Sequence, residues 1–137
     1  MRPSLTRFRV AALLTGALAR CSSGSGPDLS MCSGPVTFTF VASPTPTFSW
    51  SPNCLVDHVL VEEPLPPSFG GFHFMWQITA RAEVMGAAAP LEYGAVPESM
   101  QENIAAEPLQ VAHSYRARIY ANEVLVGERG FTYSAPD

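Results

Sequence analysis

Apolar and polar residues alternate in short runs along most of this 137-residue chain. In the segments 36–40 (VTFTF), 48–50 (FSW) and 72–78 (FHFMWQI), apolar side chains occupy every second position. Successive side chains of a β-strand point to opposite faces, so each run predicts a strand with one buried face. The chain also contains 13 prolines, which interrupt helices and favour turns. We therefore expect an all-β protein.

The remaining elements follow from the same reasoning. Further strands are predicted at 56–63, 114–121, 124–126 and 129–133. Both faces of 56–63 are partly apolar, which indicates a central strand. Turns are expected at 64–71, Asn122 and Gly127, where proline, glycine and asparagine gather. The best helical signal, at 98–107, is short and acidic and would form only a turn or two.

Residues 34–137 provide about 105 positions, enough for one small domain with a single core. Several short strands with turn signals at regular spacing are typical of an antiparallel β-sandwich. We therefore predict one β-sandwich domain at 34–137.

The first 20 residues have the layout of an export signal. Arg2, Arg7 and Arg9 form a positive head, and residues 10–19 form an apolar stretch that small residues follow. This stretch is shorter than the roughly 20 residues needed to cross a bilayer. We therefore predict a removable signal peptide at 1–20.

Cys21 follows this signal in the segment Leu18-Ala19-Arg20-Cys21, which resembles a bacterial lipobox. In that motif the cysteine becomes the lipidated first residue of the processed protein. Arg20 departs from the motif, which has a small residue there. The alternative is ordinary signal-peptidase cleavage after Ala19, which would leave a soluble secreted protein. The Ser/Gly-rich residues that follow favour lipidation at Cys21, because they predict a flexible tether, assigned to 21–33.

The other two cysteines are Cys32 and Cys54. If Cys21 carries lipid, these two can pair in an oxidising compartment and no thiol is left over. A bridge between them would close a loop of about 22 residues and stabilise the fold by roughly 3 kcal/mol. The alternative is two reduced cysteines that pack in the core.

Charge excludes some partners. The chain has 8 basic and 12 acidic residues, and four of the basic ones precede Cys21, so the processed chain has 4 minus 12, a formal charge of −8. An acidic domain without a basic cluster argues against nucleic acid as a partner. It also argues against electrostatic binding to anionic lipid, so membrane attachment is expected through the N-terminal lipid.

Two segments resemble a fibronectin type III domain, which has an immunoglobulin-like fold. Leu109 precedes Tyr115 by six residues, and Tyr115 opens an alternating strand, as at the family's E–F corner and F strand. The segment 46–50 (PTFSW) is similar to its B strand. The resemblance implies that Trp50, Leu109, Tyr115 and Ile119 lie in the core and that the Tyr115 hydroxyl bonds back to the preceding turn. It also suggests residues 91–94 as the E strand.

Candidate metal ligands are few. Three histidines, His58, His73 and His113, fall on or near different predicted strands. A zinc site needs at least three converging ligands, and no pair of these residues has the short spacing of a ligand pair. We expect scattered histidines and no metal. The alternative is a small envelope enzyme or metal-binding protein that uses them.

Catalytic motifs are also weak. No Gly-x-Ser-x-Gly turn is present to support a nucleophilic serine. Glu62 and Glu63 are neighbours on a predicted strand, so their side chains point to opposite faces and cannot act together on one substrate. We interpret them as a solvated strand end. We expect no catalytic residue and no cofactor.

Two groups of apolar residues are candidates for a contact surface. Phe72, Phe74 and Trp76 share one face of a predicted strand, where burial in the core is expected and an exposed binding stripe is the alternative. The loop after residue 63 is expected to expose apolar groups, and we assign the contact surface to its residues Leu65, Pro66, Pro67 and Phe69.

Together these features predict an exported, lipid-anchored, non-catalytic protein of the bacterial cell envelope. Its β-sandwich is expected to bind or space other envelope components, such as a protein or a glycan. Sandwich edges also permit assembly with further copies of the chain through strand addition. The binding function is an analogy with the fold, because such folds serve many functions.

Overall fold

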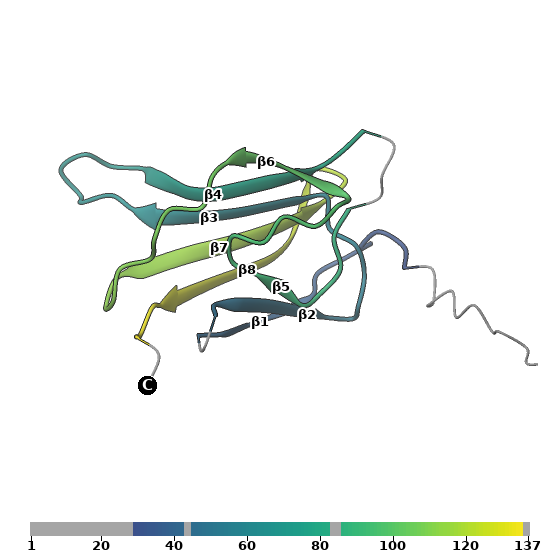
Figure 1. Ribbon diagram of the computed structural model, residues 1–137, viewed down its shortest axis with the longest axis horizontal. Helices are drawn as coiled ribbons and strands as arrows, with labels where there is room; N and C mark the ends of the chain where they lie inside the picture. The colour runs from purple at the N-terminus through teal and green to yellow at the C-terminus, as the bar shows by residue number, and fades with distance from the viewer. Residues whose placement is uncertain (1–28, 43–44, 83–85, 136–137) are drawn as a thin grey trace, which may run out of the picture.

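The computed structural model describes residues 29–42, 45–82 and 86–135, which form eight strands and no helix (Figure 1). The strands are β1 (Thr37–Val41), β2 (Thr47–Ser51), β3 (His58–Pro64), β4 (Phe72–Ala80), β5 (Leu91–Glu92), β6 (Met100–Ile104), β7 (Ser114–Ala121) and β8 (Val124–Thr132). The expectation of an all-β protein is confirmed. The signal peptide and Cys21 lie outside the described residues.

The strands form two antiparallel sheets. One has the order β1-β2-β5 and the other has the order β6-β4-β3-β7-β8. Buried side chains of both sheets, among them Phe48 of β2 and Trp76 of β4, belong to one hydrophobic cluster. The prediction of a β-sandwich is therefore confirmed. Strand β3 is the central strand of the larger sheet, with two strands on each side of it, as its apolar residues on both faces indicated.

The core lies between the two sheets. Its largest fully buried side chains include Trp76, Phe48 and Ile78. Of the expected core residues, Trp50, Tyr115 and Ile119 are buried, and Leu109 is partly buried and packs against the same cluster. Strand β7 alternates between buried and less buried positions along its whole length, as its sequence pattern predicts.

The segment 98–107 is not helical. Its central part forms β6, which pairs with β4 from Ala80↔Met100 to Gln77↔Ile104, and Met100 is fully buried. A short acidic stretch has little intrinsic helix preference, so the free edge of β4 and a place in the core for Met100 decide its conformation.

Strand β8 is continuous, so the predicted turn at Gly127 is wrong. The real turn is the two-residue connection of Asn122 and Glu123, both with positive φ, which suits a tight hairpin. Gly127 pairs with Ile119 inside the strand, and a Cβ atom there would lie 2.9 Å from Cγ1 of Ile119. Glycine is needed at this position for close packing and not for a turn.

A β-bulge interrupts β4 at Met75. Val61 pairs with Trp76, but Glu62 pairs with Phe74, so Met75 of β4 has no pairing partner in β3. Because a bulge shifts the alternation by one residue, Phe74 lies on the face opposite to Trp76. The predicted burial of Phe72 and Phe74 is wrong: they are 40% and 47% exposed, whereas Trp76 is fully buried.

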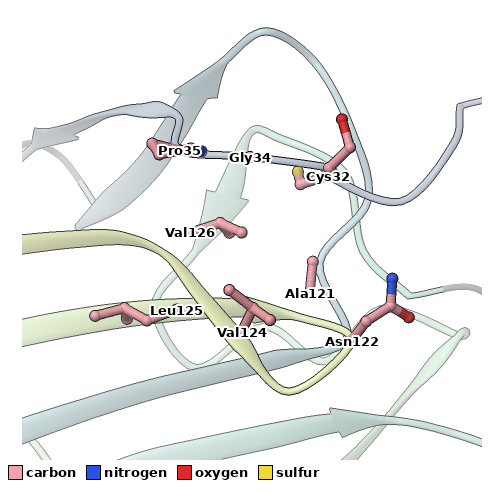
Figure 2. Close-up of a pocket in the computed structure, with 9 residues that line it drawn as sticks. Cys32, Gly34, Pro35, Ala121, Asn122, Val124, Leu125 and Val126 are labelled. Atoms are coloured by element: carbon pink, nitrogen blue, oxygen red, sulfur yellow. The ribbon is translucent and has the colours of Figure 1, made fainter.

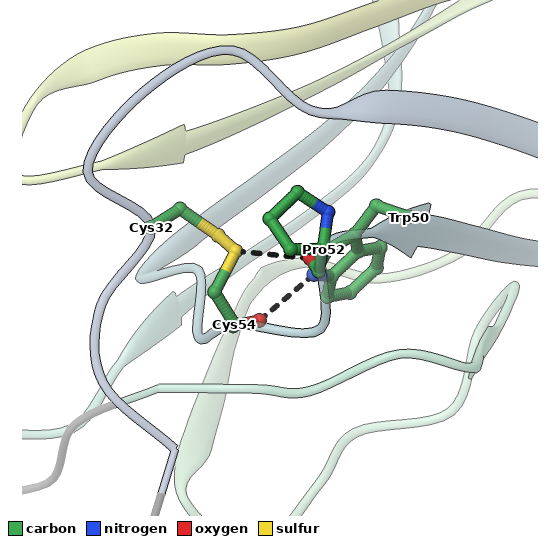
Figure 3. The surroundings of a disulfide bond; sticks show 4 residues. All are labelled: Cys32, Trp50, Pro52 and Cys54. Carbon is green, nitrogen blue, oxygen red and sulfur yellow. Dashed lines mark hydrogen bonds between the residues drawn. A yellow bond between two sulfur atoms is a disulfide. The ribbon is translucent and has the colours of Figure 1, made fainter.

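A disulfide joins Cys32 to Cys54, as expected (Figure 3). Beside it, Met31 forms a parallel bridge with Leu55, and the indole N–H of Trp50 donates a hydrogen bond to the Cys54 carbonyl at 2.8 Å. Both cysteines are buried. The folded part therefore begins before residue 34, within the segment assigned to the tether.

Candidate functional site

The connection between β3 and β4 exposes a group of apolar side chains. We call residues 64–74 the hairpin tip; Figure 1 shows it extending beyond the end of the sandwich. Leu65, Phe69, Phe72 and Phe74 are 39%, 82%, 40% and 47% exposed. The three exposed phenylalanines of the described residues all lie in this segment. Clustered exposure of this kind marks contact surfaces.

The backbone of the hairpin tip is held by its own hydrogen bonds. The Leu65 N–H donates to the Gly71 carbonyl at 3.0 Å, and the N–H groups of Phe69 and Gly70 donate to the Pro66 carbonyl at 2.9 and 3.1 Å. Gly70 and Gly71 adopt positive φ angles of 65° and 81°, which glycine adopts without strain. These bonds and the prolines define one conformation and present Phe69 outward.

The assigned contact residues Leu65, Pro66, Pro67 and Phe69 are all exposed, as the sequence indicated. The sequence pattern favoured burial of Phe72 and Phe74 and left an exposed stripe as the alternative, because the alternation was extended through Met75. The consecutive apolar residues Met75 and Trp76 were the available signal, since a strictly alternating strand would have a polar residue at position 75.

The outer face of the large sheet carries a charged network beside the hairpin tip. Glu62 is only 2% exposed and accepts a hydrogen bond from Nε of Arg116 at 2.7 Å. Nε of Arg118 lies 3.3 Å from the same carboxylate oxygen and 3.0 Å from Glu128. The sequence suggested that Glu62 is solvated. Instead, Glu62 is buried between two guanidinium groups that compensate its charge.

This network also supports the hairpin tip. Cζ of Arg116 lies 3.8 Å from the centre of the Phe72 ring, a cation–π contact. The guanidinium group of Arg116 thus contacts Glu62 and the Phe72 ring together. Hydrogen bonding to Tyr120 is the main cause that raises the pKa of Arg118, so its positive charge persists.

Two histidine–carboxylate pairs join the base of the hairpin tip, where β3 ends and β4 begins, to the connection between β6 and β7. His73 lies 2.9 Å from Glu107, and His113 lies 2.7 Å from Glu63. The Tyr93 hydroxyl lies 2.7 Å from the Glu107 carbonyl and 3.2 Å from that of Met75. Burial is the main cause that raises the Tyr93 pKa. These contacts hold the hairpin tip in a fixed direction relative to the sandwich.

The third histidine lies at the other end of β3. His58 contacts the side chain of Gln77 at 2.8 Å and stacks on the ring of Tyr120. Burial lowers its pKa, although the charge of Asp57 opposes this effect. The three histidines do not converge, and the described residues contain no group of three His, Cys, Asp or Glu arranged to hold a metal ion.

A cavity of about 230 Å³ lies at the end of the sandwich opposite to the hairpin tip (Figure 2). It is lined mainly by Pro35, Ala121, Val124, Leu125 and Val126, next to Cys32 of the disulfide. Its lining contains no histidine, carboxylate or arginine, so it lacks the groups that acid–base catalysis requires. The hairpin tip and the outer face beside it are therefore the better candidate site.

No protein-family profile, curated protein or solved structure matches this chain. The geometry of the chain itself is thus the basis for a functional proposal. None of the described residues belongs to a helix with the length and hydropathy of a membrane span.

Proposed function

We propose that this protein is an exported, lipid-anchored, non-catalytic protein of the bacterial cell envelope, and that its sandwich is a binding module. The observation that carries the proposal is the disulfide between Cys32 and Cys54. Disulfides form and persist in oxidising compartments. Pairing these two residues leaves Cys21 as the only other cysteine of the chain, at the position that resembles the lipidated residue of a lipobox.

We further propose that the sandwich is of the fibronectin type III kind, within the immunoglobulin-like architecture. In this architecture the B strand pairs with E, and C, F and G are neighbours. Strands β2 and β5 pair through Phe48 and Leu91, and β3, β7 and β8 are neighbours in the larger sheet. Strand β5 coincides with the segment that sequence analysis suggested as E. Strand β6 is an addition at the edge of β4.

The corner before β7 supports the same assignment. The Tyr115 hydroxyl accepts a hydrogen bond from the Gln110 backbone N–H at 2.8 Å. A tyrosine near the start of strand F that bonds back to the backbone a few residues upstream is the tyrosine corner of these sandwiches. The indole of Trp50, on the strand corresponding to B, lies in the core.

The binding surface of this module is, in our proposal, the hairpin tip. It presents exposed apolar side chains on a backbone that its own hydrogen bonds hold in place. A surface that is ordered before binding loses less entropy when a partner binds.

The experiment that tests the proposal is the intact mass of the protein from a bacterial host, measured with and without reductant. The expected mass corresponds to a chain that begins at Cys21, carries a diacylglycerol and an acyl group, and gains two hydrogens on reduction. A Cys21→Ser variant should lose the lipid. A mass that begins at Arg20 without lipid would contradict the anchor, and a mass unchanged by reductant would contradict the oxidising compartment.

A further inference from the structure

We propose that the hairpin tip inserts its apolar side chains into the surface of a lipid bilayer. Insertion of the hairpin tip would extend the proposed function. It depends on that function only for which membrane is contacted. The acyl group would hold one end of the domain at the membrane, and the hairpin tip would be a second contact at the opposite end.

The hairpin tip carries no formally charged residue. Residues 64–80 include no Asp, Glu, Lys or Arg, although the rest of the processed chain is rich in carboxylates. Four of the nine exposed large apolar side chains of the described residues lie in the hairpin tip. Charged groups are costly to place in a bilayer, so this segment is suited to enter one and its acidic surroundings are not.

The backbone of the hairpin tip forms several hydrogen bonds within the loop. In hydrocarbon every N–H group without a partner is costly, because no water is present to accept its hydrogen bond. Within residues 64–71, three prolines have no N–H, and Leu65, Phe69 and Gly70 donate inside the loop. Three of the five backbone N–H groups in this range therefore donate within the loop. A backbone with these internal bonds is compatible with insertion into a bilayer surface.

Charge also favours a lipid surface over an ionic partner. The processed chain has a formal charge of −8, from 4 arginines and 12 acidic residues, so anionic headgroups repel the body of the domain. Hydrophobic transfer of Phe69 and its apolar neighbours is the attraction that remains. Binding should therefore be insensitive to salt for zwitterionic lipid and weaker when anionic lipid is added.

The length of the chain before the sandwich permits both membrane contacts. The nine residues from Ser22 to Ser30 span at most about 30 Å when extended. The seven residues of β3 lead from the disulfide end to the hairpin tip and rise by about 23 Å. The two lengths are comparable, so the sandwich can lie along the membrane that holds its N-terminus.

The test uses a Phe69→Trp variant of the exported protein with vesicles of phosphatidylcholine that contain brominated phosphatidylcholine. Trp50 and Trp76 are buried, so the emission added by the variant reports position 69. We expect its emission to shift to shorter wavelength and to fall about twofold with brominated lipid, as for an aromatic ring at the membrane interface. Adding Leu65→Ser to this variant should reduce the quenching.

The matched control is Val96→Trp, at a position that is 41% exposed and belongs to the connection between β5 and β6, outside the hairpin tip. Its emission should not respond to brominated lipid. Equal responses of the two variants, or no response at position 69, would overturn the proposal. A shift that grows with protein concentration in the absence of vesicles would also overturn it, because a second copy would then be the occupant.

The same sample separates this proposal from that of the anchor. The intact mass reports whether Cys21 carries lipid, and the fluorescence reports whether position 69 enters the bilayer. An unlipidated protein whose position 69 is quenched would support insertion and contradict the anchor. A lipidated protein whose position 69 stays in water would support the anchor and contradict insertion.

Discussion

The carboxylate of Glu62 lies 2.7 Å from Nε of Arg116, although the two residues are 54 positions apart in the sequence. Glu62 is buried on the outer face of the larger sheet, on its central strand β3. The guanidinium of Arg116 compensates this charge and also stacks on Phe72 of the hairpin tip. Stability and the proposed contact surface therefore depend on the same side chain.

The Arg116→Ala variant should be strongly destabilised. Removing one partner of a buried ion pair leaves the other charge poorly compensated and costs about 3 kcal/mol. Arg118 remains near Glu62 and limits the loss. Urea unfolding at neutral pH measures the change. As a control, Glu128→Ala removes a more exposed carboxylate and should cost less than about 1 kcal/mol; equal costs would contradict the importance of burial.

The Tyr115→Phe variant tests the proposed tyrosine corner. It keeps the buried ring but removes the hydroxyl that accepts from the Gln110 N–H. The free energy of unfolding should fall by about 1 kcal/mol, the net value of one hydrogen bond. Tyr133→Phe, at a partly buried position near the end of the chain, should change it by less than about 0.5 kcal/mol. Similar values for both would argue against a special role of this corner.

The stability of the protein should depend on pH through His58. Burial lowers its pKa below the ordinary value of 6.5, so the unfolded chain binds a proton at a pH where the folded chain does not. Stability therefore rises with pH across this window, and it is lost as the pH falls through 6.5 towards the lowered pKa.

Unfolding curves at pH 7.5 and pH 5.5 measure this effect when the wild type is compared with His58→Gln. Glutamine does not titrate and retains a polar group near Gln77. The wild type should lose more stability than the variant on acidification. An identical loss in both proteins would show that other groups cause the dependence.

The Gly86→Ala variant should be severely destabilised. Gly86 has a φ of +116°, and a Cβ atom there would overlap the carbonyl oxygen of Val56, which accepts a hydrogen bond from the Ala87 N–H. Strain and loss of this bridge should cost about 3 kcal/mol or more. Gly34→Ala is the control, because a Cβ atom there meets no other atom within 4 Å. Thermal unfolding distinguishes the two.

Sequence alone determined where most strands lie and which faces are buried. The alternation in β7 placed Tyr115 and Ile119 in the core, because the direction of a side chain in a regular strand depends only on its position. Cysteine number likewise predicted the bridge from Cys32 to Cys54. The composition of the loop at 64–71 also predicted its exposed apolar residues.

Tertiary structure decided the features that depend on a neighbouring strand. The bulge at Met75 moved Phe72 and Phe74 to the surface, and the edge of β4 turned 98–107 into a partner strand. Arg116, distant in sequence, made the burial of Glu62 tolerable. Register and charge compensation are properties of pairs of segments. One segment's pattern cannot specify them, because the energy that fixes them comes from contacts that exist only after the strands meet.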